Sequence, residues 1–123
     1  RQDFIYAIKR QQRHLQGAVC TDLGIVTDDV RVALSGSSAI LLESNHDVEM
    51  LRKGPYPYML KKRILSDEGH LSNEKCAWLA TQLAIWGTTR IALGHLSEHN
   101  NTYEKAYISP DGSNRYDGFV HQV

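Results

Sequence analysis

Two short segments of the sequence, residues 69–72 and 94–97, both have the sequence Gly-His-Leu-Ser. In each segment a histidine directly follows a glycine, and a predicted helix and a short predicted strand lie between the two. Imidazoles at the ends of neighbouring elements commonly bind metals or transfer protons in catalysis. The repeated pattern therefore predicts that His70 and His95 take part in chemistry.

Three predicted strands end on a residue that could bind a metal or transfer a proton. Asp22 follows a strand at residues 17–21, Glu43 closes an apolar run, and His95 follows a strand at residues 89–93. Because the carboxyl ends of strands in a layered α/β domain line one edge, we expect these groups to share a site. Histidine and carboxylate sets of this kind hold divalent metals.

Each of these residues also has a structural explanation. Asp22 fits a turn before Gly24, and Glu43 fits a solvated strand end. His70 could cap or precede the helix that follows it. His46 lies near Glu43 in the sequence, and a loop histidine bonded to the backbone explains it as well as catalysis does.

A basic and aromatic cluster stands at residues 56–63, where Lys61, Lys62 and Arg63 accompany Tyr56 and Tyr58. Such a cluster can hold phosphates while its rings stack on bases. A solvated helix face explains it equally well.

The remaining pattern predicts the elements of one α/β domain. Strands are expected at residues 4–9, 17–21, 39–43 and 89–93, helices at 27–34, 47–53, 73–86 and 101–107, and an edge strand at 119–120. The apolar run at 39–43 predicts a strand buried on both faces. In the helix at 73–86, Trp86 is expected to widen the apolar stripe.

Composition limits the possible classes of protein. With 123 residues, 41% of them apolar, the chain forms at most one domain. Its 14 basic and 14 acidic residues create no overall field for nucleic acid or anionic lipid, so a nucleic-acid partner needs a local basic patch or a metal. No apolar run approaches the roughly 20 residues of a membrane span, and we expect a cytoplasmic protein without membrane contact. The separated Cys20 and Cys76 are expected to be reduced core residues.

Five motifs together resemble the metallo-β-lactamase-fold phosphodiesterases, in particular the YycJ-like branch of DNA exonucleases. Their order and spacing match across nearly the whole chain. The motifs are Thr21-Asp-Leu-Gly24, Leu42-Glu-Ser-Asn-His-Asp47, Gly54-Pro-Tyr-Pro57, Gly69-His-Leu-Ser-Asn-Glu74, and Gly94-His-Leu-Ser97 with Asn100-Asn101.

The resemblance implies a different role for each histidine. In that superfamily a carboxylate after a strand bridges two metal ions and a later histidine completes one metal's shell, and Asp22 and His95 fall at these positions. In the related tRNase Z enzymes a glutamate orients a histidine that donates a proton to the leaving oxygen, and Glu43 and His70 fall there. The expected edge of the site, where substrate could bind, comprises His46, Lys61, Lys62, Arg63, Asn100 and Asn101.

The chain departs from the family pattern in one respect, because it contains no His-x-His-x-Asp-His segment. Residues 1–123 therefore resemble the C-terminal half of an αββα sandwich, namely one mixed sheet with helices on one face. The resemblance implies two divalent ions, zinc or manganese, in the complete enzyme, with partial or no occupancy in this half. Half a sandwich leaves one sheet face uncovered, so we expect a homodimer or a missing N-terminal half.

The implied function is metal-dependent phosphodiester hydrolysis, as a 5′-3′ DNA exonuclease when complete and with little or no turnover in this half alone. The pairing of Glu43 with His70 favours phosphodiester over lactam chemistry. Two alternatives remain open. One is another hydrolase of the same fold, acting on RNA, a thioester or a lactam, and the other is a non-catalytic interaction fragment.

Overall fold

The computed structural model describes residues 4–10, 15–21, 39–66, 69–116 and 120–122. In chain order its elements are β1 (Phe4–Arg10), β2 (Leu15–Thr21), β3 (Ala39–Glu43), α2 (Val48–Lys53), α3 (Tyr58–Leu65), α4 (Asn73–Ile85), β4 (Arg90–Gly94), α5 (Tyr103–Tyr107) and β5 (Val120–Gln122). The predicted helix at residues 27–34 lies outside the described residues. The other predicted elements are present, with bounds that differ by at most two residues.

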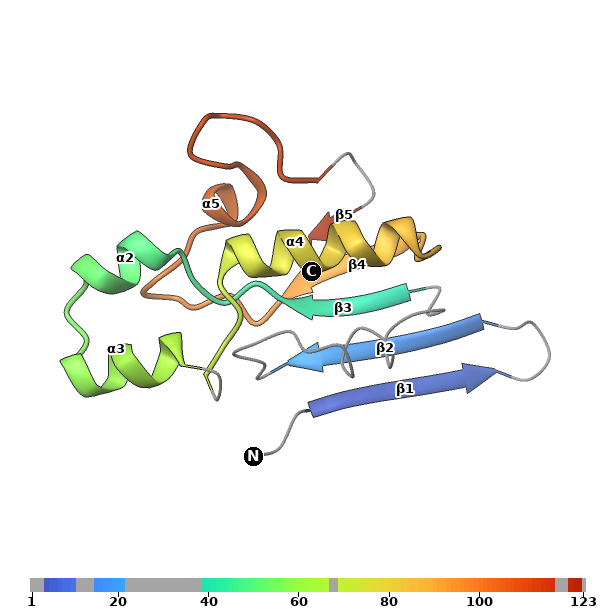
Figure 1. Ribbon diagram of the computed structural model, residues 1–123, viewed down its shortest axis with the longest axis horizontal. Coiled ribbons are helices and arrows are strands. Elements are labelled where there is room, and N and C mark those ends of the chain that lie inside the picture. The colour runs from blue at the N-terminus through green and yellow to red at the C-terminus, as the bar shows by residue number, and fades with distance from the viewer. Residues whose placement is uncertain (1–3, 11–14, 22–38, 67–68, 117–119, 123) are drawn as a thin grey trace.

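The strands form one mixed sheet in the order β1-β2-β3-β4-β5. β1 and β2 pair antiparallel, whereas β2, β3, β4 and β5 run parallel to one another. The register pairs Cys20 with Leu42 and Glu43 with Gly94. The carboxyl ends of β2, β3 and β4 therefore lie at the same edge of the sheet (Figure 1).

Helix α4 packs on one face of the sheet and closes the core. Its apolar side chains recur at helical spacing, and Cys76, Leu79, Ala80 and Leu83 are all buried. They join the inward-facing side chains of β3 and β4 in one cluster, which includes Ile40, Leu42, Ile91 and Leu93. Two local signals set the length of the helix. The Ser72 hydroxyl caps its N-terminus, and Gly87, at φ 104°, follows its C-terminus.

The opposite face of β3 and β4 is not covered to the same degree by the described part of the chain. Burial along both strands alternates, so that Leu41 and Ala92 are only half-buried while their neighbours face α4. The expectation of a strand buried on both faces therefore does not hold for β3 here. Trp86 likewise does not extend the buried stripe, because it is 42% exposed.

Helices α2 and α3 lie beyond the carboxyl ends of the strands (Figure 1). The Asp47 carboxylate caps α2 by accepting the Met50 N–H at 2.8 Å. Among the described residues no helix is long and apolar enough to cross a bilayer. The Cys76 thiol is free and buried, and burial raises its pKa to about 11, which keeps it protonated at neutral pH.

Candidate active site

Glu43 and His95 come together because β3 and β4 are parallel neighbours. Glu43 is the last residue of β3 and lies opposite Gly94, the last residue of β4. The Ser44 N–H extends the ladder by donating to the Gly94 carbonyl at 3.1 Å. The next residue after β4, His95, is thus placed beside the carboxylate, as the strand-end argument predicts.

The Glu43 carboxylate is fully buried and contacts both histidines of the repeated pattern. Its Oε2 lies 3.0 Å from His70 Nδ1 and also contacts His95 Nδ1, while Oε1 accepts the Leu71 N–H at 3.3 Å. The two imidazoles meet edge to face, with ring centroids 5.3 Å apart. When Glu43 is ionised, both Nδ1 atoms carry protons, and each Nε2 is then the nitrogen available to a metal or a substrate.

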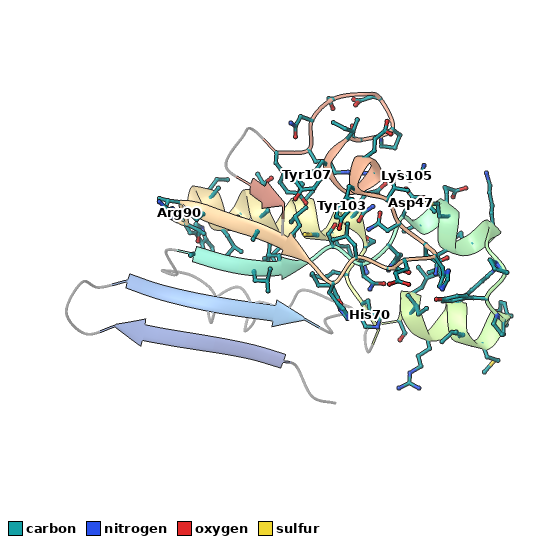
Figure 2. All side chains as sticks on the ribbon, turned by 180° about the vertical axis from the view of Figure 1, so that it is seen from behind. Asp47, His70, Arg90, Tyr103, Lys105 and Tyr107 are labelled. Carbon is teal, nitrogen blue, oxygen red and sulfur yellow. The ribbon has the colours of Figure 1, made fainter. Side chains whose placement is uncertain are left out.

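Helix α3 and a glycine determine the position of His70. The His70 N–H donates to the Ile64 carbonyl at 3.1 Å, and the Gly69 N–H donates to the Ser66 carbonyl at 3.0 Å. A Cβ at Gly69 would lie only 2.1 Å from the Ile64 carbonyl oxygen. Only glycine permits this close approach of the backbone. His70 consequently lies between the strand ends and α3 (Figure 2).

His95 is positioned differently, by a left-handed turn. Its φ is 56°, a conformation that is unfavourable for residues with a Cβ. The Asn45 side-chain amide donates to the His95 carbonyl at 3.0 Å, and the Asn45 carbonyl accepts the Ser97 N–H at 2.7 Å. Asn45 therefore holds this turn from two sides. Sequence reasoning missed Asn45, and its position two residues after a strand-terminal acid was the available signal.

A buried amide pair fixes the backbone next to Glu43. Asn73 and Asn101 exchange side-chain hydrogen bonds at 2.8 and 2.9 Å. The Ser44 hydroxyl donates to Asn73 Oδ1 at 2.7 Å, and the Asn101 amide donates to the Ser44 carbonyl at 2.9 Å. Sequence reasoning did not identify Ser44 or Asn73, and it placed Asn101 at the site edge. In the structure Asn101 is buried and joins β3 to the start of α4.

Asn100 is also buried rather than exposed to a ligand. Its carbonyl accepts the Asp47 N–H at 2.9 Å, and its Oδ1 has no hydrogen-bond partner within the described residues. A Cβ at Gly54 would lie 3.1 Å from that oxygen. Asn100 thus packs against the turn that begins the Gly54-Pro-Tyr-Pro motif.

His46 lies close to the site but faces the interior. It is 1% exposed, its Nδ1 is 3.3 Å from Asn45 Oδ1, and its Nε2 has no partner among the described residues. Burial, reinforced by the nearby His70, lowers the pKa of His46 to about 4. His46 is therefore neutral at pH 7.

The other predicted residues fall in two places. Lys61, Lys62 and Arg63 belong to α3, whose last turn is hydrogen-bonded to His70. Asp22 lies outside the described residues. It is the residue after Thr21, where β2 ends at the same edge of the sheet as β3 and β4.

The donor set suits a divalent metal. One ligand atom each from Glu43, His70 and His95 lies within 4.8 Å of the others, and this is the only such group of three or more among the described residues. Imidazole nitrogens and carboxylate oxygens are ligands for zinc and manganese. A histidine whose Nδ1 bonds to a carboxylate is the usual form of a metal-binding histidine.

Comparisons with known proteins agree with this geometry. No family model matches the chain. It is 45% identical over 104 residues to an exodeoxyribonuclease YycJ of Bacillus anthracis, an alignment that covers 85% of this chain and 39% of that protein. It is 46% identical over 89 residues to an exodeoxyribonuclease WalJ of Streptococcus pneumoniae, covering 72% of this chain and 33% of that one. The chain thus spans less than two fifths of the length of these relatives.

A solved structure shares the fold. A diphosphatase of the PhnP family, a protein of the metallo-β-lactamase type, superposes with a TM-score of 0.53 at 14% identity, over 87% of this chain and 32% of that one. The resemblance predicted from the five motifs, to metallo-β-lactamase-fold hydrolases and to YycJ-like exodeoxyribonucleases, is confirmed.

Proposed function

We propose that this chain is the C-terminal half of a metal-dependent phosphodiester hydrolase of the metallo-β-lactamase fold, acting on DNA from the 5′ end. The observation that carries the proposal is the buried Glu43 carboxylate in contact with Nδ1 of both His70 and His95. The 45% identity to an exodeoxyribonuclease supports DNA as the substrate class.

Within this site His95 and Asp22 are the residues we assign to metal binding. The carboxylate contact at Nδ1 leaves Nε2 of His95 for the ion, and Asp22 follows the neighbouring strand end. Two divalent ions, zinc or manganese, would be held here together with histidines from the upstream half. When bound, such ions lower the pKa of a water molecule and neutralise charge on the phosphate.

His70 is the residue we assign to the leaving group. Its Nδ1 contacts Glu43, and this contact fixes both the tautomer and the orientation of the His70 ring. Its side chain is 29% exposed, which opens it to a substrate. A proton donated from Nε2 to the departing oxygen would lower the barrier to bond cleavage by general acid catalysis.

The half-buried Leu41 and Ala92 support the half-domain assignment. They lie on the face of β3 and β4 that is turned away from α4. We propose that the upstream half of the sandwich, or a second copy of the chain, covers this face. Light scattering of the chain with and without an added upstream half measures which of the two occurs.

The decisive experiment compares His70→Ala with His95→Ala in the full-length protein. We expect His70→Ala to reduce kcat on single-stranded DNA by about 100-fold or more while the metal content is unchanged. We expect His95→Ala to lower metal content, measured by elemental analysis after dialysis. His99→Ala is the matched control, because His99 is an exposed histidine of the same loop.

The outcomes separate the alternatives. Faster cleavage of a matched RNA strand than of the DNA strand would favour an RNA substrate. Unchanged hydrolysis in His70→Ala would exclude the acid role and favour a non-catalytic fragment. Loss of metal from His70→Ala and His95→Ala alike would mean that Glu43, His70 and His95 bind one ion together.

A further inference from the structure

Positive charge is concentrated in one stretch of a chain that is neutral overall. Residues 50–66 hold five of the 14 Lys and Arg residues and no Asp or Glu, although the chain as a whole has 14 acids and a formal net charge of zero. The acids Asp67 and Glu68 come next and end this stretch. A local field of this kind attracts polyanions even when the molecule has no net charge.

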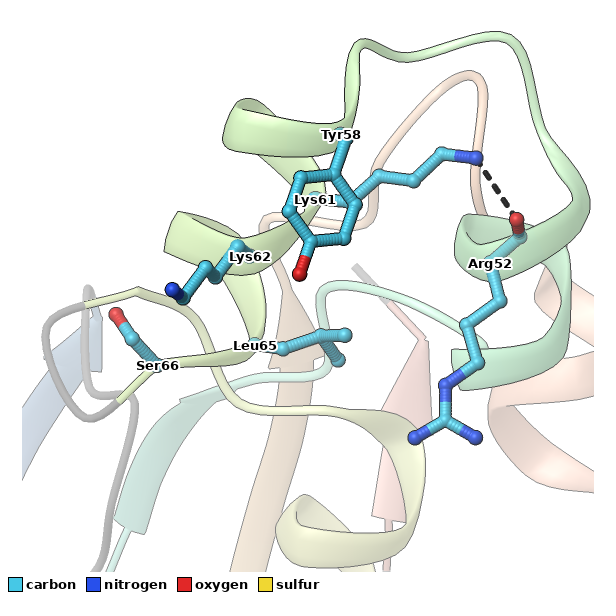
Figure 3. A pocket seen from close by; sticks show the side chains of 6 residues that line it. All are labelled: Arg52, Tyr58, Lys61, Lys62, Leu65 and Ser66. Atoms are coloured by element: carbon cyan, nitrogen blue, oxygen red, sulfur yellow. Dashed lines mark hydrogen bonds between the residues drawn. The ribbon is translucent and has the colours of Figure 1, made fainter.

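This basic stretch folds into a cavity between α2 and α3. The cavity has a volume of about 630 Å³ and is lined by Arg52, Tyr58, Lys61, Lys62, Leu65 and Ser66. In Figure 3 the Tyr58 ring and Leu65 lie between the side chains of Arg52 and Lys62. We call it the α2–α3 pocket. It combines an aromatic ring, an apolar floor and several cations.

The cations of the pocket are available to a ligand. Among ion pairs within the described residues, none involves Arg52, Lys61 or Lys62, whereas Lys53 pairs with Glu49 at 3.6 Å. Lys61 Nζ donates to the Arg52 carbonyl at 2.7 Å, which joins α3 to α2. An ammonium group has three N–H donors, so this bond leaves two of them for a ligand.

Tyr58 provides the second kind of contact. Its side chain is 74% exposed although it is a large aromatic group, so a flat ligand can lie against the ring without any rearrangement of the core. Unpaired bases stack on such rings, while the neighbouring phosphates bind cations. A paired base in a duplex does not offer its face in this way. Single-stranded nucleic acid is therefore the ligand that fits.

The pocket is connected directly to the candidate proton donor. Ser66 lines the pocket and accepts the Gly69 N–H at 3.0 Å, and Ile64, in the last turn of α3, accepts the His70 N–H at 3.1 Å. A ligand in the pocket thus lies next to the backbone that positions His70.

We propose that the α2–α3 pocket binds an unpaired stretch of the DNA substrate beside the site of cleavage, with a base stacked on Tyr58 and adjacent phosphates on Lys61, Lys62 and Arg52. This inference rests on the proposed function. Because His70 is assigned to the leaving oxygen, the pocket holds the strand on the leaving-group side of the scissile bond. The pocket then determines affinity for the strand without taking part in bond cleavage.

The test measures binding and chemistry separately in the full-length protein. Binding of a fluorescent twelve-residue oligothymidylate is followed by anisotropy in EDTA at several salt concentrations, and hydrolysis of bis(p-nitrophenyl) phosphate is followed with manganese. We expect Lys61→Gln with Lys62→Gln to raise Kd about tenfold and to reduce the magnitude of the salt slope by about 1.4, since each contact to a single strand contributes about 0.7. We expect Tyr58→Ala to raise Kd about tenfold with little change in that slope.

The matched control is Lys105→Gln, which removes a charge on α5 beside Glu104, far from α3 in the sequence. An equal loss of binding in this control would show a general charge effect and overturn the pocket. Unchanged oligonucleotide affinity in the pocket variants would also overturn it. So would variants that lose binding to phosphatidylserine vesicles but keep their affinity for the oligonucleotide. If the wild-type protein fails to hydrolyse the small phosphodiester, the proposed function fails, while the anisotropy result still decides whether the pocket binds DNA.

Discussion

The two Gly-His-Leu-Ser segments, residues 69–72 and 94–97, have identical sequences and nearly equivalent contacts. In each the histidine Nδ1 contacts Glu43 Oε2. In each the serine hydroxyl accepts a backbone N–H three residues later, from Lys75 at 3.2 Å and from Asn100 at 3.1 Å. The same four residues therefore make the same two kinds of contact twice.

The segments differ in what holds them. Gly69 is enclosed by backbone carbonyls, whereas a Cβ at Gly94 would meet the Leu41 side chain at 3.1 Å. His95 has a positive φ and a side chain that is 51% exposed, against 29% for His70. A repeated motif can thus place two like residues on one carboxylate while leaving one ring more enclosed and the other more open.

The largest effect is expected where the two segments meet. Glu43→Gln keeps the side-chain volume but removes the negative charge and replaces one acceptor oxygen with an NH2 donor. It therefore weakens the contacts to both histidines. We expect kcat on DNA to fall by about 100-fold or more and metal affinity to fall by about 10-fold to 100-fold. Steady-state kinetics and metal titration of the full-length protein measure the two effects.

The control for this variant is Glu104→Gln, an exposed acid on α5. If Glu43→Gln lost activity but kept full metal affinity, Glu43 would support only the first segment. The two segments would then not share Glu43 as a functional group.

The two glycines give the next largest difference. Gly69→Ala places a methyl group 2.1 Å from a backbone oxygen, which cannot move aside without shifting the end of α3. We expect the free energy of unfolding to fall by about 3 kcal/mol, at the upper end for overpacking. Gly94→Ala meets only a flexible leucine side chain, and about 1 kcal/mol is expected. Urea unfolding of the two variants measures both, and equal losses would contradict the asymmetry.

Sequence reasoning predicted much of this arrangement, because the strand ends and the glycines are local signals. Ala39–Glu43 and the helix beginning at Asn73 follow from apolar spacing, and the meeting of Glu43 with His70 was implied by the resemblance. The strand ends predicted that His95 lies near Glu43, but not that its Nδ1 contacts the same carboxylate oxygen as His70 does. That contact depends on the parallel register of β3 and β4, which no single segment of sequence specifies.

The buried polar residues could not be predicted for a similar reason. Asn45, Asn73 and Asn101 are typical surface or turn residues by composition. Their burial depends on partners 28 to 57 residues away in the sequence, so only the folded chain pairs them. Asn101, which was expected at the site edge, is buried and bonded to Asn73 and Ser44.

His46 pairs with Ser72 of the first segment and makes the stability of the chain depend on pH. Its carbonyl accepts the Asn73 N–H at 2.9 Å, and burial lowers its pKa from 6.5 to about 4. Between these values the unfolded chain binds a proton that the folded chain does not bind. The free energy of unfolding therefore carries no penalty from His46 above pH 6.5. As the pH drops toward 4, it falls by about 3 kcal/mol because of this group. Unfolding of wild type and His46→Gln at several pH values isolates this contribution, and equal slopes would contradict it.

The serines provide the smallest and most direct test of the symmetry. Ser72 caps a helix of 13 residues, so Ser72→Ala leaves a helix N–H without its acceptor and is expected to cost about 1 kcal/mol. Ser97 accepts an N–H within a loop that follows an exposed histidine, where water can replace the hydroxyl, and about 0.5 kcal/mol is expected. The rank matters more than either value, because it compares equivalent atoms of one repeated motif. If urea unfolding shows that Ser97→Ala costs more than Ser72→Ala, the second segment is the more tightly held of the two, which would contradict the view that residues 94–97 form the more open segment.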